Sequence, residues 1–156
     1  MHVLSLLQTK SNPDLSLFIK SRMGLWFKFL LSRRPMQKIV DDLMDAIPGV
    51  IAIAVSEIDS GMALASKSKL LSFEPEIAAA YNAEVIKQKL KAKRALGLEK
   101  MDLEDILITM TDQYHVLTIV PGNKFFVYTI ASKDSNLAII RNALRKRLAD
   151  IANNIA

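Results

Sequence analysis

Hydrophobic positions along this chain change their spacing several times, and each spacing predicts a different kind of element. Beyond Pro35, which suits the first turn of a helix, apolar residues recur every three or four positions as far as Ile47. Pro48-Gly49 is expected to end that helix. Residues 50–55 are then continuously apolar, a pattern typical of a central strand that is covered on both faces.

Turn residues divide the other apolar runs into short strands. Asp59-Ser60-Gly61 joins the first strand to a weaker one over residues 62–66, and Pro121-Gly122-Asn123 forms a second tight turn. Residues 105–111 carry apolar side chains on both sides, so we expect this strand to be exposed on neither face. The three later strands are expected at residues 105–111, 114–120 and 125–131.

The segment from Pro75 to Leu96 predicts a long helix with two apolar stripes, which Gly97 is positioned to end. One stripe is enough for a helix to pack on its own core, so the second stripe requires a further surface. Either another copy of the chain or the chain's own first 35 residues would have to cover it. The first stripe comprises Ala78, Tyr81, Val85, Ala92 and Leu96. The second comprises Ala79, Ala83, Ile86 and Leu90.

A final helix is expected to begin near Asp134 or Ser135, either of which can cap it. The predicted order is therefore α-β-β-α-β-β-β-α. Because neighbouring strands within each group are joined by hairpins, the simplest arrangement is one five-stranded antiparallel sheet with helices on both faces. The predicted fold class is α/β, of the α+β kind.

Composition predicts one ordinary domain preceded by a basic segment. The chain has 156 residues, of which 51% are hydrophobic, and this is enough for a substantial core. Its formal net charge of +5 arises within residues 1–35, because the 15 basic and 15 acidic residues from Met36 onward cancel. We therefore expect no nucleic-acid partner for the domain at residues 36–156.

Cysteine is absent, which excludes disulfides and thiolate ligands and is compatible with a cytoplasmic location. The longest apolar run near the start, residues 25–31, is interrupted by Lys28. It falls short of the roughly 18 residues that are needed to span a bilayer. We expect neither a transmembrane segment nor a signal peptide.

Residues 1–35 form a basic, amphipathic N-terminal extension in the predicted domain organisation. Three interpretations stay open: a helix packed on the domain, a segment that lies on an acidic membrane or partner, or a stretch that is not translated because Met36 begins the domain. In the second interpretation residues 14–31 would make the contact, since aromatic and basic side chains alternate there. The contact residues would be Lys20, Arg22, Trp26 and Lys28.

The order of elements, together with local residues, resembles the roadblock/dynein light chain family. The resemblance covers about residues 36–156 and rests on the helix end Ile47-Pro48-Gly49-Val50, the turn Asp59-Ser60-Gly61, the alanine-rich helix from Pro75 and the strand at residues 125–130. These motifs are patterns of apolar and turn residues without a catalytic fingerprint. These motifs therefore support an assignment of fold more strongly than an assignment of function.

The resemblance implies a non-enzymatic protein that dimerises. In this family the long middle helix pairs with its counterpart, and the following strand extends the sheet across the interface. Members serve as dynein light chains, as scaffold subunits and, in bacteria, as regulators of small Ras-like GTPases. We therefore expect a cytoplasmic adaptor or regulator that binds itself and a small GTPase, or a motor or scaffold complex. Its facing residues are expected to be Ala79, Ala83, Ile86, Leu90, Ile106, Ile108 and Met110.

Candidate chemistry is sparse along the chain. His115 lies on a predicted strand with no nucleophile beside it, no spacing of histidines and carboxylates suits a metal, and no phosphate loop is present. We expect no metal and no cofactor. Arg141, Arg145 and Arg147 could act in trans on a GTPase, although solvated helix charges explain them more simply. The alternative function is small-molecule sensing, for which the interior positions offer few convergent polar groups.

Overall fold

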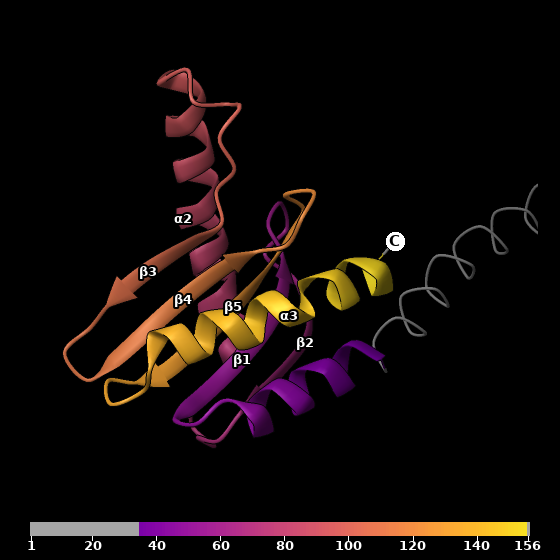
Figure 1. Ribbon diagram of the computed structural model, residues 1–156, viewed down its shortest axis with the longest axis vertical. Helices are drawn as coiled ribbons and strands as arrows, with labels where there is room; N and C mark the ends of the chain where they lie inside the picture. The colour runs from indigo at the N-terminus through magenta and orange to yellow at the C-terminus, as the bar shows by residue number, and fades with distance from the viewer. Residues whose placement is uncertain (1–34, 156) are drawn as a thin grey trace, which may run out of the picture. The chain divides into compact units, whose positions relative to one another are not determined.

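One five-stranded antiparallel sheet organises residues 35–155, the part of the chain that the computed structural model describes. The strands lie in the order β2-β1-β5-β4-β3, so β2 and β3 are the edges (Figure 1). They are β1 (Val50–Glu57), β2 (Ala63–Ser68), β3 (Asp105–Thr109), β4 (Gln113–Ile119) and β5 (Phe125–Ser132). The helices within these residues are one over 35–46, α2 (Pro75–Ala95) and α3 (Leu137–Ile155). The predicted order and fold class are confirmed.

The continuous apolar run of β1 matches its position in the interior of the sheet, between β2 and β5. β1 pairs antiparallel with both β2 and β5, so that Ile53 lies opposite Lys67 on one side and Thr129 on the other. The side chains of residues 52–55 are all 0% exposed. A strand with neighbours on both sides and helices on both faces needs apolar residues at every position, as the sequence pattern predicted.

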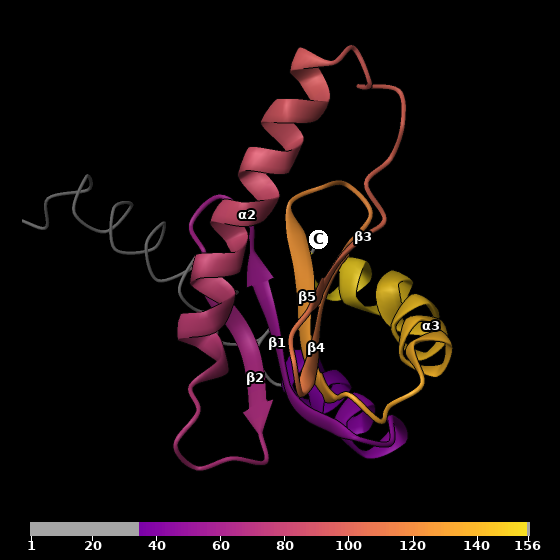
Figure 2. The same cartoon turned by 90° about the vertical axis from the view of Figure 1, so that its left-hand side faces the viewer.

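The sheet separates two apolar cores. The 35–46 helix and α3 cover one face, and α2 covers the other (Figure 2). Successive strand side chains point to opposite faces, so Ile53 and Val55 enter the first core while Ala52 and Ala54 enter the second. The large Tyr128 side chain fills the second core beneath α2. No helix among the described residues is long and apolar enough to cross a membrane.

α3 begins later than the sequence indicated. Its capping residue is Asn136, whose Oδ1 accepts hydrogen bonds from the backbone N–H of Ala138 at 2.9 Å and of Ile139 at 3.3 Å. The expectation that Asp134 or Ser135 caps the helix was therefore wrong. An asparagine oxygen serves this role as well as a serine or aspartate oxygen, so residue type alone did not separate three adjacent candidates.

β3 is more exposed than its alternating pattern indicated. Four of its five residues are half-buried, and Thr109 is exposed. The strand has a single neighbour, β4, and α2 packs mainly over β1 and β2, on the other side of the sheet's central strand. The expectation that this strand is exposed on neither face was wrong, because its apolar side chains lie at the margin of both cores.

Candidate functional site

α2 uses one of its two apolar stripes to cover the chain's own sheet. Ala79, Ala83 and Ile86 are each 0% exposed and belong to the same core as Ala54 and Tyr128. Alanine at two successive turns brings the helix close to the strands. This corrects the expected facing set, because these three side chains are already covered by the sheet of the same chain. Leu90, from the same set, is half-buried against this core.

The stripe that remains accessible is the other one. Tyr81 is 75% exposed, Val85 is 43% exposed and Leu96 is 68% exposed. A contact made by α2 with any partner would therefore use these side chains. The sequence carried one signal for this choice, since Tyr81 is a large residue with a polar tip that tolerates water, whereas the buried positions hold alanines and an isoleucine.

Polar contacts on the flanks of α2 show which way the accessible stripe points. On one flank Glu76 contacts the Ser66 hydroxyl of β2, and Lys87 Nζ donates to the Asp59 carbonyl at 3.2 Å. On the other flank Asn82 interacts with Tyr128 of β5. Residues 78, 81 and 85 follow Asn82 around the helix on that second side. At about 100° per residue Ala78 and Val85 therefore border the side of α2 that is nearer to β4 and β3, whereas Tyr81 points almost directly away from the sheet.

β3 adds apolar side chains and a strand edge that no other described residue pairs with. Ile106 and Ile108 are half-buried against the α2-side core, and Met110 is 52% exposed. These three residues, two in β3 and Met110 directly after it, were expected at a dimer interface, and each retains accessible surface. Together with Tyr81 and Val85 they define what we call the α2–β3 face.

The hydrogen bonds of β3 identify which backbone groups are free at its outer edge. Ile119 N–H donates to the Glu104 carbonyl and Met110 N–H donates to the Gln113 carbonyl, both at 2.9 Å. Antiparallel pairing alternates, so even-numbered residues of β3 bond to β4. The N–H and C=O groups of Leu107 and Thr109 therefore point away from the sheet, ready to pair with another strand.

The opposite edge of the sheet is partly occupied. Gln37 Nε2 donates to the Ser66 carbonyl of β2 at 3.0 Å, and Lys67 of the same strand is paired with Asp41 at 2.9 Å. The hydrogen bond between Lys67 and Asp41 lowers the pKa of the Asp41 carboxyl and raises the pKa of the Lys67 amine. Side chains of the 35–46 helix thus border β2, and β3 is the more open edge.

A buried polar pair lies under the α2–β3 face. The Tyr128 hydroxyl lies 2.9 Å from His115 Nδ1, and His115 Nε2 lies 3.2 Å from Gln113 Oε1. Burial lowers the pKa of the His115 ring and raises the pKa of the Tyr128 hydroxyl to about 12, although a hydrogen bond with Asn82 opposes the second shift. Both groups are therefore held neutral, and no nucleophile adjoins them within the described residues.

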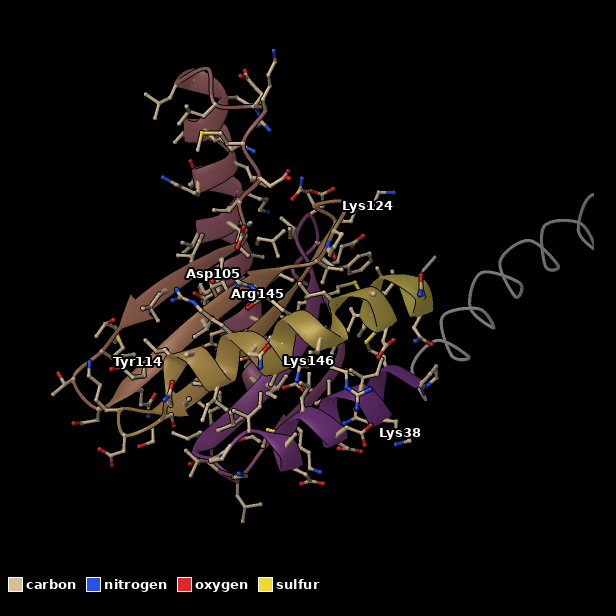
Figure 3. All side chains as sticks on the ribbon, in the orientation of Figure 1. Lys38, Asp105, Tyr114, Lys124, Arg145 and Lys146 are labelled. Atoms are coloured by element: carbon tan, nitrogen blue, oxygen red, sulfur yellow. The ribbon has the colours of Figure 1, made fainter. Side chains whose placement is uncertain are left out.

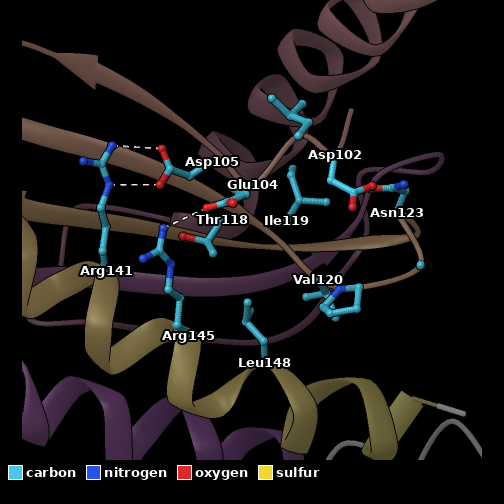
Figure 4. A pocket seen from close by; sticks show the side chains of 13 residues that line it. Asp102, Glu104, Asp105, Thr118, Ile119, Val120, Asn123, Arg141, Arg145 and Leu148 are labelled. Atoms are coloured by element: carbon cyan, nitrogen blue, oxygen red, sulfur yellow. Dashed lines mark hydrogen bonds and ion pairs between the residues drawn. The ribbon is translucent and has the colours of Figure 1, made fainter. Parts of the chain in front are cut away.

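A cavity of about 410 Å³ lies on the opposite face, between α3, the start of β3 and the turn after β4 (Figure 4). Two ion pairs border it. Arg141 Nε and Nη2 donate to the two Asp105 carboxylate oxygens, each at 2.9 Å, and Arg145 Nη2 donates to Glu104 at 2.8 Å. Thr118 Oγ1 is buried at its wall without a hydrogen-bond partner among residues 35–155. Four of the five charged residues that line the cavity, all except Asp102, are thus already paired with each other.

The arginines that could act in trans on a GTPase are all ion-paired. Arg141 and Arg145 make the pairs at the cavity, and Arg147 lies 3.2 Å from both Asp42 and Asp150. These contacts join α3 to β3 and to the 35–46 helix. They favour a structural role over that of an inserted arginine, which sequence reasoning left open.

The remaining expected site residues lie outside the described part of the chain. They are Lys20, Arg22, Trp26 and Lys28, the contact residues of the segment at 14–31. Among residues 35–155 there is no group of three or more His, Asp or Glu side chains arranged to hold a metal ion.

Comparison with solved structures identifies the fold. A Roadblock/LC7 domain from Streptomyces avermitilis superimposes with a TM-score of 0.68 at 9% sequence identity, covering 76% of this chain and 96% of that one. Myxococcus xanthus MglB gives 0.68 at 14% identity, covering 79% and 88%. An MglB structure with a tetrameric arrangement gives 0.63 at 11% identity, covering 75% and 85%. No family model matches the sequence, and no curated protein matches it.

These identities are too low to carry function, but they confirm the expected fold. The chain has the architecture of Roadblock/LC7 domains over most of the length of the structures it matches. The resemblance drawn from the helix end at Pro48-Gly49 and the alanine-rich α2 therefore holds at the level of structure.

Proposed function

We propose that this chain is a non-catalytic, cytoplasmic adaptor that works as a homodimer and binds a small Ras-like GTPase. The observation that carries the proposal is the α2–β3 face, where the described residues leave uncovered both the apolar side chains Tyr81 and Val85 of α2 and the outer edge of β3. A two-fold axis beside β3 would pair the free backbone groups of Leu107 and Thr109 with those of a second copy.

Burial of apolar surface supports self-association at this face. Removing a valine-sized side chain fully from water is worth about 1.5–3 kcal/mol, and a two-fold interface includes every contact residue twice. Tyr81, at 75% exposed, adds a large side chain whose hydroxyl can stay wet at the rim. The tetrameric arrangement of the similar MglB structure also supports assembly between copies of such a domain.

The partner class follows from the family resemblance, whose bacterial members regulate small Ras-like GTPases. A dimer joined through β3 would present a continuous sheet with α3 and the 35–46 helix of both copies on one side. Because the α3 arginines are ion-paired, the adaptor would act through shape and surface and not through an arginine inserted into the partner's active site. A motor or scaffold complex is the second partner class that the resemblance admits.

Small-molecule sensing is less well supported. It would require the cavity beside α3, where Arg141 and Arg145 are already bound by carboxylates. A ligand would have to compete with the bidentate Arg141–Asp105 pair, which is the stronger kind of ion pair. We therefore retain the adaptor as the proposed function.

The mass of the full chain in solution tests the dimer. The monomer is 17.4 kDa, so light scattering after size exclusion should give twice this value for the wild type and the single value for Val85→Asp. Leu71→Asp is the matched control, because Leu71 is fully exposed in the loop before α2 and should leave the dimer intact. If Val85→Asp stays folded at the wild-type mass, the α2–β3 face is not the interface.

Capture by the intact chain tests the partner. The wild type should retain a small GTPase, and GTP turnover by that GTPase should change when the wild type is added. Val85→Asp should lose this effect if the composite face of the dimer is what the GTPase contacts. Repeated capture without any GTPase, motor or scaffold subunit would count against the adaptor.

A further inference from the structure

The C-terminal end of α2 stands clear of the rest of the domain. Figures 1 and 2 show the helix continuing beyond the sheet, with the chain turning back towards β3 only after it. Of residues 91–101, every one except Lys93 is exposed. We call residues 87–101 the α2 tip.

The α2 tip concentrates positive charge. It contains six basic residues and one acidic residue, Glu99, although basic and acidic residues are equal in number over residues 36–156 as a whole. The rest of the domain is correspondingly acidic. Among the described residues only Lys87 of the tip makes an ion pair, with Glu84. The basic residues are Lys87, Lys89, Lys91, Lys93, Arg94 and Lys100.

The α2 tip also exposes three large apolar side chains. Leu96 is 68% exposed, Leu98 is 40% exposed and Met101 is 62% exposed. A basic last turn alone is explained by the partial negative charge at a helix C-terminus. That effect explains Lys93 and Arg94, but it does not explain apolar residues placed at the far end of a projecting helix.

Backbone hydrogen bonds hold these apolar residues in an ordered turn. Gly97 has a left-handed φ of 68°, Leu98 N–H donates to the Lys93 carbonyl at 2.9 Å and Gly97 N–H donates to the Arg94 carbonyl at 3.0 Å. This is the Schellman arrangement at a helix end. Met101 N–H then donates to the Leu98 carbonyl at 3.1 Å. The turn therefore presents apolar side chains in a preformed geometry directly after the basic last turns of α2.

We propose that the α2 tip binds the surface of an anionic lipid bilayer. Leu96, Leu98 and Met101 enter the boundary between headgroups and acyl chains, and the surrounding lysines and Arg94 contact the anionic headgroups. Each basic residue close to such a surface contributes attraction that salt weakens. This site is separate from Tyr81 and Val85 and does not depend on the adaptor proposal.

The shape of the tip favours a bilayer over an acidic protein. A stable protein interface buries about 800 Å² on each partner and needs complementary shape. The α2 tip is a single projecting helix end, which offers a small convex surface (Figure 2). A bilayer accommodates such a shape because lipids move around inserted side chains, and its negative surface complements the charge of the tip.

A site-specific probe tests the proposal, since the chain has no cysteine of its own. The full chain with Met101→Cys, labelled with an environment-sensitive fluorophore, is mixed with vesicles of phosphatidylcholine alone or with added phosphatidylserine. We expect a blue shift and a rise in intensity only with phosphatidylserine, reversed by high salt. Lys146→Cys on α3 is the control position (Figure 3). A fluorophore there should keep the emission of a water-exposed probe with both kinds of vesicle.

Two pairs of matched variants test which forces act. Lys91→Glu with Arg94→Glu should lower partitioning onto the anionic vesicles about tenfold or more, whereas Lys124→Glu with Lys146→Glu changes the net charge equally and should have a smaller effect. Leu96→Ser with Met101→Ser should weaken binding more than Met62→Ser with Leu71→Ser. All eight positions are exposed, so the fold should persist, as circular dichroism can verify.

Several results would overturn the proposal. A probe at residue 101 that stays water-like while the chain sediments with anionic vesicles would mean that another segment, such as residues 1–35, makes the contact. A probe that is shielded before vesicles are added would mean that a second copy covers the tip. If Lys91→Glu with Arg94→Glu weakened vesicle binding no more than Lys124→Glu with Lys146→Glu, the net charge of the chain would explain the binding.

Discussion

The Tyr128 hydroxyl and the His115 ring form a hydrogen bond of 2.9 Å beneath the α2–β3 face. Tyr128 is 1% exposed, and burial keeps its hydroxyl protonated by raising the pKa to about 12. In the ring tautomer with the proton on Nε2, the hydroxyl donates to His115 Nδ1 and Nε2–H donates to Gln113 Oε1; in the other tautomer Nδ1–H donates to the hydroxyl. Protonation of the ring makes Nδ1 a donor, so the Tyr128 hydroxyl must then accept from it.

The first prediction concerns pH. Because burial lowers the pKa of His115 in the folded chain, the unfolded chain binds a proton first as pH falls. The free energy of unfolding should therefore decrease below about pH 6.5, the unfolded histidine value, until the lower folded pKa is reached. The slope should stay below about 1.4 kcal/mol per pH unit, since the ring is only partly buried. Urea unfolding of wild type and His115→Gln between pH 5 and about 7.5 measures this.

His115→Gln removes this titration together with the ring's hydrogen bonds, so the stability itself can change, but the variant should have a shallower pH dependence than the wild type in that window. Other groups, including His2, contribute equally to both proteins and cancel in the difference. Identical pH profiles would mean that the ring titrates normally in the folded chain.

The second prediction separates the two stripes of α2 by stability. Ile86 is 0% exposed and Val85 is 43% exposed. Ile86→Ala should lower the free energy of unfolding by about 2–5 kcal/mol, because it removes buried methylenes and leaves a cavity. Val85→Ala should lower the free energy of unfolding of a monomer by less than about 1 kcal/mol. Its main effect should be to weaken self-association. Similar costs for both, measured by urea unfolding at one low concentration, would contradict this division.

The third prediction compares two glycines with left-handed backbones. Gly49 has φ 75° and Gly97 has φ 68°, so alanine at either position adds about 1–2 kcal/mol of backbone strain. A Cβ at Gly49 would also overlap Ser135 Oγ, whereas nothing lies within 4 Å of one at Gly97. Gly49→Ala should therefore lower the melting temperature clearly more than Gly97→Ala. Equal decreases in melting temperature for the two variants would mean that Ser135, just before α3, moves aside without loss of stability.

The fourth prediction concerns the ion pairs at the α3 cavity. In the Arg141–Asp105 pair, exposure is 36% and 17%; in the Arg145–Glu104 pair it is 58% and 71%. Double-mutant cycles should give a coupling of about 1 kcal/mol or more for the first, bidentate pair and less for the second, where water screens the charges. The coupling energy of the Arg141–Asp105 pair should stay larger than that of the Arg145–Glu104 pair when salt is added. A larger coupling for Arg145–Glu104 would contradict it.

The fifth prediction tests the strand edge. Thr109 is exposed, and its N–H points away from β4. Thr109→Pro should leave the β3–β4 ladder intact but block pairing of β3 with another strand. The melting temperature of the monomer should change little, and the mass in solution should fall to that of one chain. A dimer that survives this substitution would pair through α2 alone.

Much of the fold could be predicted from local patterns. The apolar run at residues 50–55 identified β1 as central, and turn residues such as Asp59-Ser60-Gly61 identified the hairpins, because both signals depend on neighbours in sequence. The exposure of β3 and the cap of α3 were missed. The first depends on how far α2 reaches across the sheet, and the second on a choice among adjacent polar residues.

The sequence by itself determined that α2 carries two apolar stripes and that one of them requires a surface beyond a single core. Only the tertiary structure decided which stripe packs on the chain's own sheet and which one stays accessible. The two stripes have similar hydrophobicity, so periodicity cannot rank them, whereas packing can: Ala79 and Ala83 allow close approach to the sheet, and Tyr81 at the same place would not fit. The basic charge of residues 87–101 is visible in the sequence, but only the tertiary structure decided that this segment is exposed, because its exposure depends on how far α2 extends beyond the strands.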